Sequence, residues 1–301
     1  MGDAELSTSA PQQTRSPTRG TRGPRGPRIA ARPRILLLDE PEAFLHPSAV
    51  RGARDALYAL AGAPGWQVVV STHSPVFIDV SRPHTTIVRV ERAGGDVATF
   101  SSDLVAFDED ERKRLQMIKA CHPSVNEFFF AERVLVEGDT EQMVLGDLLA
   151  SSPHKDRVHI VNCLGKANLI LFARILNHFR KPYTVLHDAD SRWAVTRAGK
   201  RIKNPAWTIN RQICEEVARG RAAGVDAHAV ASVPDFEREH FGAPASADKP
   251  YRSWMKLRDP GQRKKLAGYL DALVAGNAAH DYRELADLAK MSKMFVDRGT
   301  T

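Results

Sequence analysis

The sequence has little that would place it in a membrane or cross-link it covalently. No run approaches the ~18 to 20 consecutive apolar residues of a membrane-spanning helix, and the N-terminus lacks the apolar core of a secretory signal. The three cysteines, Cys121, Cys163 and Cys214, are isolated from one another, which argues against a disulfide framework or a cysteine-based zinc site. We therefore expect a cytoplasmic protein that does not associate with a membrane.

The sequence also lacks the loop GxxxxGK[ST], which cradles the β- and γ-phosphates of a nucleotide. Gly165–Lys166 has no upstream glycine and is followed by Ala, and Gly199–Lys200 is followed by Arg. The chain alone should therefore bind ATP poorly. ATP is expected as a cofactor only if another chain supplies the missing loop.

Positive charge is concentrated at the N-terminus. Residues 1–34 hold seven arginines against two acids, so they carry +5 of the net charge of +7. Residues 1–33 are rich in Ser, Thr, Pro, Gly and Arg, a composition that predicts disorder because too little apolar surface can be buried. This segment is either a basic arm that contacts phosphates or a leader without function, and we favour the leader.

Beyond the leader, apolar runs alternate with helical patterns, which predicts an α/β protein with parallel strands. We expect an incomplete α/β lobe over residues 34–104, with a hairpin at Gly94–Gly95, and a helical linker over residues 105–130. A second α/β domain should occupy residues 131–250, followed by a helical segment over 251–301.

The first chemical motif is an apolar run, Ile35 to Leu38, that leads into Asp39 and Glu40. Such a strand can deliver an aspartate that organises Mg²⁺ and a glutamate that polarises water. A lone motif of this kind is common. The strings DEPEAFLHP and STHSP, the latter containing His73 after the next strand, together resemble the C-terminal end of an ABC-type ATPase lobe. By this resemblance His73 would contact the γ-phosphate.

The second motif is VLVEGDTE, in which a buried strand ends at Glu137. Gly138 should allow a tight turn, and a helix should begin near Thr140, with Asp139 or Thr140 as its cap. Glu141 would then lie on the first helical turn and face the strand end. Stabilisation of the helix N-terminus would explain an acid at Glu141 almost as well.

The third motif is TVLHDAD, in which another strand leads to Asp188 and Asp190. Residues i and i+2 of a strand point to the same side, and sites in open α/β sheets form at the carboxyl ends of strands. Acids that converge there repel one another unless cations lie between them. Oxygen ligands favour Mg²⁺ or Mn²⁺ over zinc. His187 is expected to pack within its strand.

A strand–Glu–Gly–helix unit followed by a strand–DxD unit resembles a TOPRIM domain, a Rossmann-like parallel sheet. Directly after an STHSP segment, the arrangement resembles that of the OLD (overcoming lysogenization defect) family of ATP-dependent nucleases, and the resemblance covers roughly residues 34–255. It implies a set of metal ligands: Glu137, Glu141, Asp188, Asp190, Asp235 and Glu237. It also implies that Lys249 lies near the scissile phosphate and acts in catalysis with Glu137, Asp188 and Asp190, and that Gly165 forms a turn between the two acidic strands.

Each of the weaker candidates has an ordinary structural alternative. Asp235 and Glu237 would also suit a solvated turn, Lys249 an ordinary surface lysine, and Lys166 either a phosphate contact or a solvated turn. The function implied by the resemblance is a Mg²⁺- or Mn²⁺-dependent DNA endonuclease that uses two metal ions. The alternative is an inactive or split fragment that only binds DNA or a partner. Expected partners are DNA and either a second copy or an upstream ATPase-lobe polypeptide.

Overall fold

The computed structural model describes residues 33–82, 85–93, 95–102, 107–121, 123–242 and 248–298. The sequence-based predictions for residues 1–32, including the basic leader, lie outside this part of the chain. No helix within the described ranges is long and apolar enough to cross a membrane.

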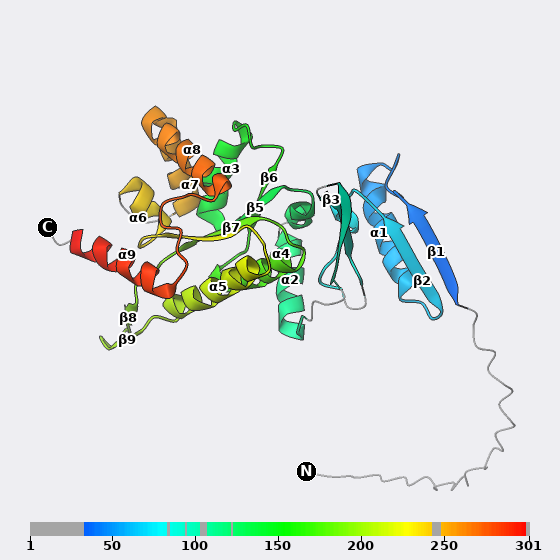
Figure 1. The fold of residues 1–301 in the computed structure, drawn as a ribbon, viewed down its shortest axis with the longest axis horizontal. Helices are drawn as coiled ribbons and strands as arrows, with labels where there is room; N and C mark the ends of the chain where they lie inside the picture. Colours follow the sequence, from blue (N-terminus) through cyan, green and yellow to red (C-terminus); the bar gives the residue numbers. More distant parts are fainter. Residues whose placement is uncertain are drawn as a thin grey trace, which may run out of the picture.

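Strands and helices divide the described chain into two regions (Figure 1). The N-terminal lobe contains β1 (Arg34–Asp39), α1 (Pro47–Ala61), β2 (Trp66–Ser71), η1 (Pro75–Phe77), β3 (Val88–Ala93) and β4 (Asp96–Ser101). Two helical segments connect it to the second region: α2 (Glu109–Cys121) and η3 (Pro123–Phe129). The second region contains β5 (Arg133–Glu137), α3 (Asp139–Ala150), β6 (Val158–Asn162), α4 (Lys166–His178), β7 (Tyr183–Asp188), β8 (Trp193–Val195), β9 (Arg201–Lys203), α5 (Pro205–Ala222), β10 (Ala227–Ser232), α6 (Phe236–Phe241), α7 (Lys249–Met255), η4 (Lys256–Arg258), α8 (Pro260–Ala275) and α9 (Leu285–Arg298).

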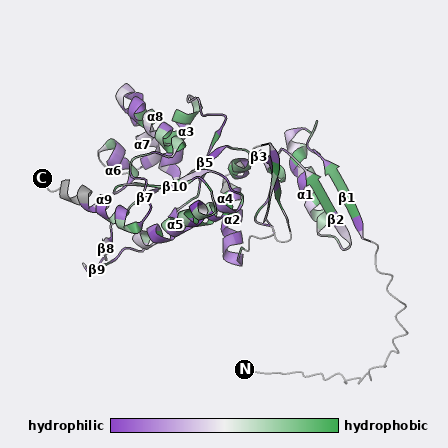
Figure 2. Ribbon diagram, viewed as in Figure 1, coloured by the Kyte–Doolittle hydropathy of each residue, from purple (hydrophilic) through white to green (hydrophobic). Residues whose placement is uncertain are grey.

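The N-terminal lobe has two small sheets. β1 and β2 pair in parallel, and β3 and β4 form the antiparallel hairpin expected around Gly94–Gly95. A continuous apolar run is typical of a buried strand, yet in β1 Ile35 is 62% exposed and Leu37 is 70% exposed. α1 covers one face of the β1–β2 sheet, and the apolar colouring of these strands is visible in Figure 2. Parallel sheets are normally covered on both faces, whereas among the described residues only one face of this sheet is covered.

The second region is built on a four-stranded parallel sheet with the order β10-β7-β5-β6. Its two central strands, β7 and β5, are those that carry the acidic motifs. Because all four strands run the same way, their carboxyl ends meet at one edge. The topology therefore places the end of β5 beside the end of β7, and Ser232 of β10 pairs with Asp188.

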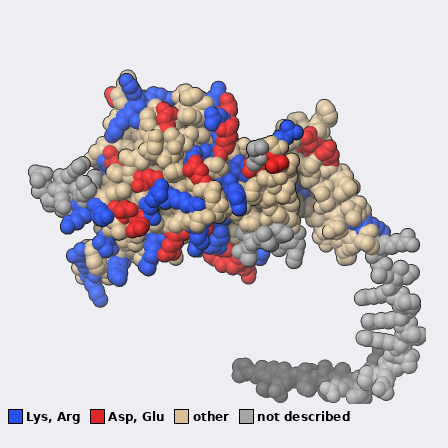
Figure 3. Space-filling view, in the orientation of Figure 1, with Lys and Arg blue, Asp and Glu red and all other residues tan. Residues whose placement is uncertain are grey.

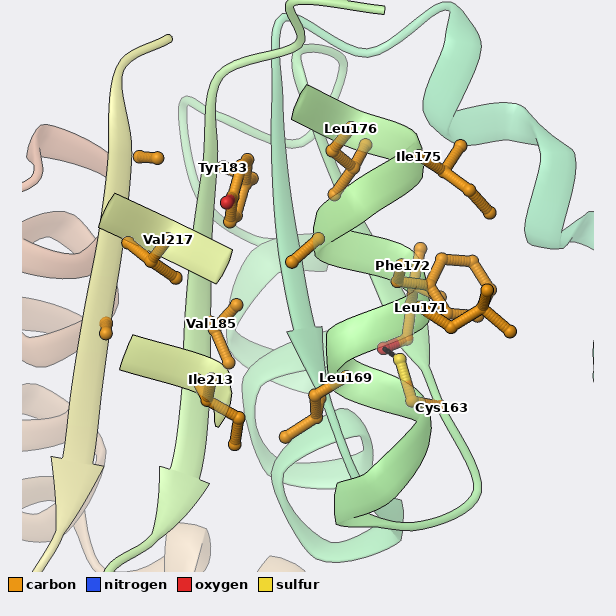
Figure 4. Packing of buried hydrophobic residues seen from close by; sticks show 14 of the residues in the cluster. Cys163, Leu169, Leu171, Phe172, Ile175, Leu176, Tyr183, Val185, Ile213 and Val217 are labelled. Atoms are coloured by element: carbon orange, nitrogen blue, oxygen red, sulfur yellow. Dashed lines mark hydrogen bonds between the residues drawn. The ribbon is translucent and has the colours of Figure 1, made fainter. Parts of the chain in front are cut away.

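Each face of this sheet has its own hydrophobic core, because successive side chains of β7 and β10 point to opposite faces. Val185 and Ala229 join the core formed with α4 and α5, which Figure 4 shows from close by. Leu186 and Val230 join the core formed with α3 and α8. The sheet is thus covered on both sides, and its carboxyl edge is held rigidly between two packed layers.

Candidate nuclease site

Asp188 and Asp190 lie at the carboxyl end of β7, but strand alternation does not bring them together. β7 ends at Asp188, and Asp190 has a left-handed backbone with φ 61°. The backbone N–H groups of Ala189 and Asp190 donate to Ser232 and Pro234, at 2.7 and 2.9 Å. The two acids share the edge because the chain turns there against β10. The reason we gave from the sequence was wrong.

Lys166, the first residue of α4, reaches into this acidic edge. Its Nζ lies 2.6 Å from Asp190 Oδ2 and donates to the carbonyl oxygen of Asp188 at 2.5 Å. The side chain is only 15% exposed. Of the two roles that the sequence left open, the solvated turn is therefore wrong. Lys166 therefore places a positive charge among these acidic residues.

Asp188 occupies the most electrostatically unfavourable place in the cluster. Burial raises its pKa to about 7, opposed by the backbone N–H of Phe236, which donates to Oδ1 at 2.9 Å. The carboxylates of Glu237, Asp190 and Asp235 raise this pKa further. A carboxyl that resists ionisation beside other acids is stabilised as a carboxylate when a cation is bound.

His187 packs within its strand, as expected. It is buried, its Nε2 lies 2.7 Å from the hydroxyl of Tyr282, and its Nδ1 lies 2.9 Å from the carbonyl oxygen of Asp188. Burial lowers the pKa of His187 to about 3, so the ring is neutral. The C-terminal segment before α9 thereby braces the end of β7.

Helix α6 adds acids from a third direction. Glu237 is buried, and its Oε1 accepts a hydrogen bond from the Thr140 hydroxyl at 3.1 Å, so the solvated-turn alternative is wrong for this residue. Lys249 Nζ lies 3.9 Å from the same oxygen. Asp235 is instead the N-cap of α6: it accepts the N–H of Arg238 at 2.8 Å and pairs with the Arg238 guanidinium at 3.0 Å.

The β5–α3 turn differs in detail from our prediction. The N-cap is Gly138, with no capping side chain, and Asp139 is the first helical residue, so neither Asp139 nor Thr140 is the cap. Gly138 has φ −99°, an extended conformation that does not require glycine. Glu141 lies buried in the first turn. The backbone of Glu137 ends β5 at the carboxyl edge, and its side chain lies outside the described part of the structure.

One polar residue at this edge escaped sequence reasoning. Asn162 ends β6, and its Nδ2 donates to Asp139 Oδ1 at 2.5 Å and to Gln142 Oε1 at 3.1 Å. Its own Oδ1 accepts the N–H of Leu164 at 2.8 Å. Asn162 therefore ties the start of α3 to the turn before Lys166. An Asn at the end of an apolar strand, three residues before Gly165, was the available signal.

The ATPase-like residues also converge. Ser71 donates to Asp39 across the β1–β2 ends, and His73 Nε2 lies 3.2 Å from Glu40 Oε1. Glu42 holds the loop after β2, because it accepts from the Thr72 hydroxyl at 2.5 Å and from the backbone of His73 at 3.0 Å. Asp39, Glu40 and His73 are all exposed.

Asp188, Asp190 and Glu237 offer carboxylate oxygens, the ligands that a hard divalent cation prefers. Among the described side chains, which exclude that of Glu137, no group of three or more Asp, Glu, His or Cys residues is arranged so that it could hold a metal ion. Metal binding is therefore a proposal that rests on the chemistry of these acids. The pairing of Asp190 with the Lys166 ammonium group shows that they attract a positive charge.

Comparison with known proteins gives this geometry a family context. Residues 128–190 match the TOPRIM domain family of overcoming-lysogenization-defect-like proteins, and residues 22–79 match the AAA domain family of the AbiEii toxin, type IV toxin–antitoxin system. An OLD nuclease of Thermus scotoductus (strain ATCC 700910 / SA-01) is 30% identical over 237 residues, which cover 75% of this chain and 44% of that protein. The Old nuclease of Escherichia phage P2 is 30% identical over 162 residues, 52% of this chain and 28% of that protein.

The predicted resemblance to the OLD family is thus confirmed, as are the AAA-like and TOPRIM domains and the helical C-terminus. The chain spans less than half the length of these curated relatives.

Proposed function

We propose that this chain is a divalent-metal-dependent DNA endonuclease of the OLD type, with its catalytic centre at the carboxyl edge of β5 and β7. The observation that carries the proposal is the gathering of Asp188 and Asp190, at the end of β7, with Glu237 of α6, while Lys166 pairs with Asp190. A carboxyl whose pKa is raised by burial and by neighbouring acids, as that of Asp188 is, is typical of a functional site. The names of the two curated relatives support a nuclease.

Glu137, Glu141, Asp188, Asp190 and Glu237 are the residues that would hold Mg²⁺ or Mn²⁺. Bound ions of this kind lower the pKa of water and neutralise charge on a leaving oxygen. The chain's own groups have distinct tasks. Thr140 orients Glu237, and Lys166 holds Asp190 in its left-handed turn. We assign Asp235 to capping α6 rather than to binding metal, since its oxygens are occupied by Arg238.

Lys249 would stabilise the charge that develops on the scissile phosphate. It is the first residue of α7, its side chain is 51% exposed, and it approaches the acidic edge at Glu237. An ammonium group at the border of the cluster can face both a carboxylate and an incoming phosphate.

The exposed Asp39, Glu40 and His73 would contribute to an ATP site only when another polypeptide supplies the phosphate-binding loop. The uncovered face of the β1–β2 sheet supports a partner there, either a second copy or an ATPase-lobe polypeptide.

Nicking of supercoiled plasmid tests the proposal. We expect cleavage by wild type with Mg²⁺ or Mn²⁺, none with EDTA, and a loss of at least ~100-fold in Glu137→Ala and Asp188→Ala. An Asp271→Ala variant, which alters an exposed acid on α8, should cleave normally. A cooperatively folded wild type that cuts no DNA with either metal would contradict the proposal and favour an inactive fragment that acts as a binding module.

A further inference from the structure

The segment that follows Asp190 is unusually basic. From Ser191 to Cys214 the chain holds six Lys or Arg residues and no Asp or Glu, although the whole chain has 36 acids in 301 residues. Five of the six lie on or beside the β8–β9 hairpin and are exposed: Arg192, Arg197, Lys200, Arg201 and Lys203. Within the described part of the chain, none of these five forms an ion pair with an acid.

The hairpin is fixed to the carboxylate edge at its base. Asn204 donates from its backbone to the carbonyl oxygen of Arg192 at 3.1 Å, and from its side chain to that of Ser191 at 2.8 Å. Asn210 of α5 donates to the carbonyl oxygen of Ala189 at 2.8 Å. Both ends of the hairpin are thereby anchored within a few residues of Asp188 and Asp190. The base of the hairpin is therefore joined directly to the carboxylate edge.

The pairing of β8 with β9 sorts the side chains by face. Trp193 lies opposite Lys203, so strand alternation places Trp193, Arg201 and Lys203 on one face and Ala194 and Ile202 on the other. The Arg201 guanidinium stacks over the Trp193 ring, 4.5 Å from its centroid, and Trp193 remains 43% exposed. One face of the hairpin is therefore both cationic and aromatic.

We propose that this face of the β8–β9 hairpin binds the phosphodiester backbone of the DNA strand that enters the carboxylate site. The inference rests on the proposed nuclease function and names the surface that presents the substrate to it. Unpaired basic side chains beside an exposed aromatic ring are the combination that holds a nucleic-acid strand, through phosphate contacts and base stacking. Figure 3 shows Lys and Arg gathered over this hairpin, at the lower left of the view.

Binding is measured by fluorescence anisotropy with a labelled 20-nucleotide single strand and its duplex, in EDTA so that metal-dependent cleavage does not interfere. Arg201→Ala/Lys203→Ala should weaken binding about tenfold or more at 0.1 M salt and reduce the log–log salt slope by up to about two units. The matched control is Lys264→Ala/Lys265→Ala, two exposed lysines on α8, which lies far from the hairpin in Figure 1. This control should bind within about twofold of wild type.

The aromatic contribution is tested separately. Trp193→Ala should weaken single-strand binding more than duplex binding, and Trp193→Phe should restore most of the loss, since phenylalanine retains a ring on which a base can stack. Equal binding by wild type and the Arg201/Lys203 variant would overturn the inference, even if wild type cleaves plasmid. Normal hairpin-dependent binding by a wild type that never cleaves would instead overturn the nuclease proposal and leave this inference standing.

Discussion

At the scale of single residues, the site depends on one internal cation. Lys166 lies within 2.6 Å of Asp190, and a divalent metal held by the same acids would sit close to this ammonium group. The two positive charges would repel each other, so Lys166 both orders the carboxylates and competes with the ion.

Lys166→Met should therefore bind Mn²⁺ about tenfold more tightly than wild type, because one repulsive charge is removed at short range. Lys166→Arg keeps the charge and should bind Mn²⁺ as wild type does. Both affinities are measured by titration with Mn²⁺. Weaker binding in Lys166→Met would show that orienting Asp190 outweighs the repulsion, and would contradict this account.

The sequence indicates candidate site residues, but it does not indicate how they meet. Glu137 and Asp188 were found because each ends an apolar strand, a local signal. The pairing of Lys166 with Asp190 joins residues 24 positions apart, and the bond from Thr140 to Glu237 spans 97 positions. Such contacts depend on the order of strands in the sheet, which no local pattern encodes.

At the scale of elements, the packing on the sheet face opposite α3 requires α4 and α5 to lie close to each other. Asn177 of α4 donates to Glu216 of α5 and accepts from the Tyr183 hydroxyl of β7, each at 2.9 Å. This network lies directly against Gly220. A Cβ there would overlap the Asn177 amide and lie 3.2 Å from the Tyr183 hydroxyl.

Gly220→Ala should therefore destabilise the protein by about 2 kcal/mol through overpacking. The matched control is Gly146→Ala in α3, where a Cβ would meet nothing within 4 Å. It should stabilise by about 0.5–1 kcal/mol, because alanine is the better helix former. Chemical denaturation of both variants measures these changes in the free energy of unfolding. Equal effects on the free energy of unfolding would mean that the helices do not pack as closely as described.

Secondary-structure elements, too, were predicted where a local pattern marks them and missed where none does. The periodicity of the sequence identified the β3–β4 hairpin and both acidic strands, because each lies within one short window. The β8–β9 hairpin was missed, since its three-residue strands are too short and too polar for an alternating pattern to stand out. The position of α3 was predicted, but its cap was wrong, because Asp139 and Thr140 both resemble caps although Gly138 serves as the cap.

At the scale of the whole molecule, the two regions differ in how much of their sheet surface is covered. The four-stranded sheet is covered on both faces, whereas the β1–β2 sheet leaves Ile35, Leu37 and Val69 on an open apolar face, with Val69 54% exposed. Exposed apolar sheet surface of this kind favours association.

The chain by itself should therefore self-associate at micromolar concentration, and Ile35→Thr/Leu37→Thr/Val69→Thr should reduce the mean mass seen by light scattering. Met117→Gln/Met143→Gln removes exposed apolar side chains from two separate helices and should leave the association unchanged. A wild type that is monomeric at every concentration would show that the open face is tolerated in water.

Direct detection of bound Mn²⁺ by electron paramagnetic resonance tests the central claim, that the β7 edge is a metal centre. Wild type and Asp271→Asn should both remove the free Mn²⁺ signal as protein is added, while Asp188→Asn should leave most of it, although all three unfold cooperatively. Equal binding of Mn²⁺ by wild type and Asp188→Asn would contradict the account, because the ion would then be held somewhere other than this cluster.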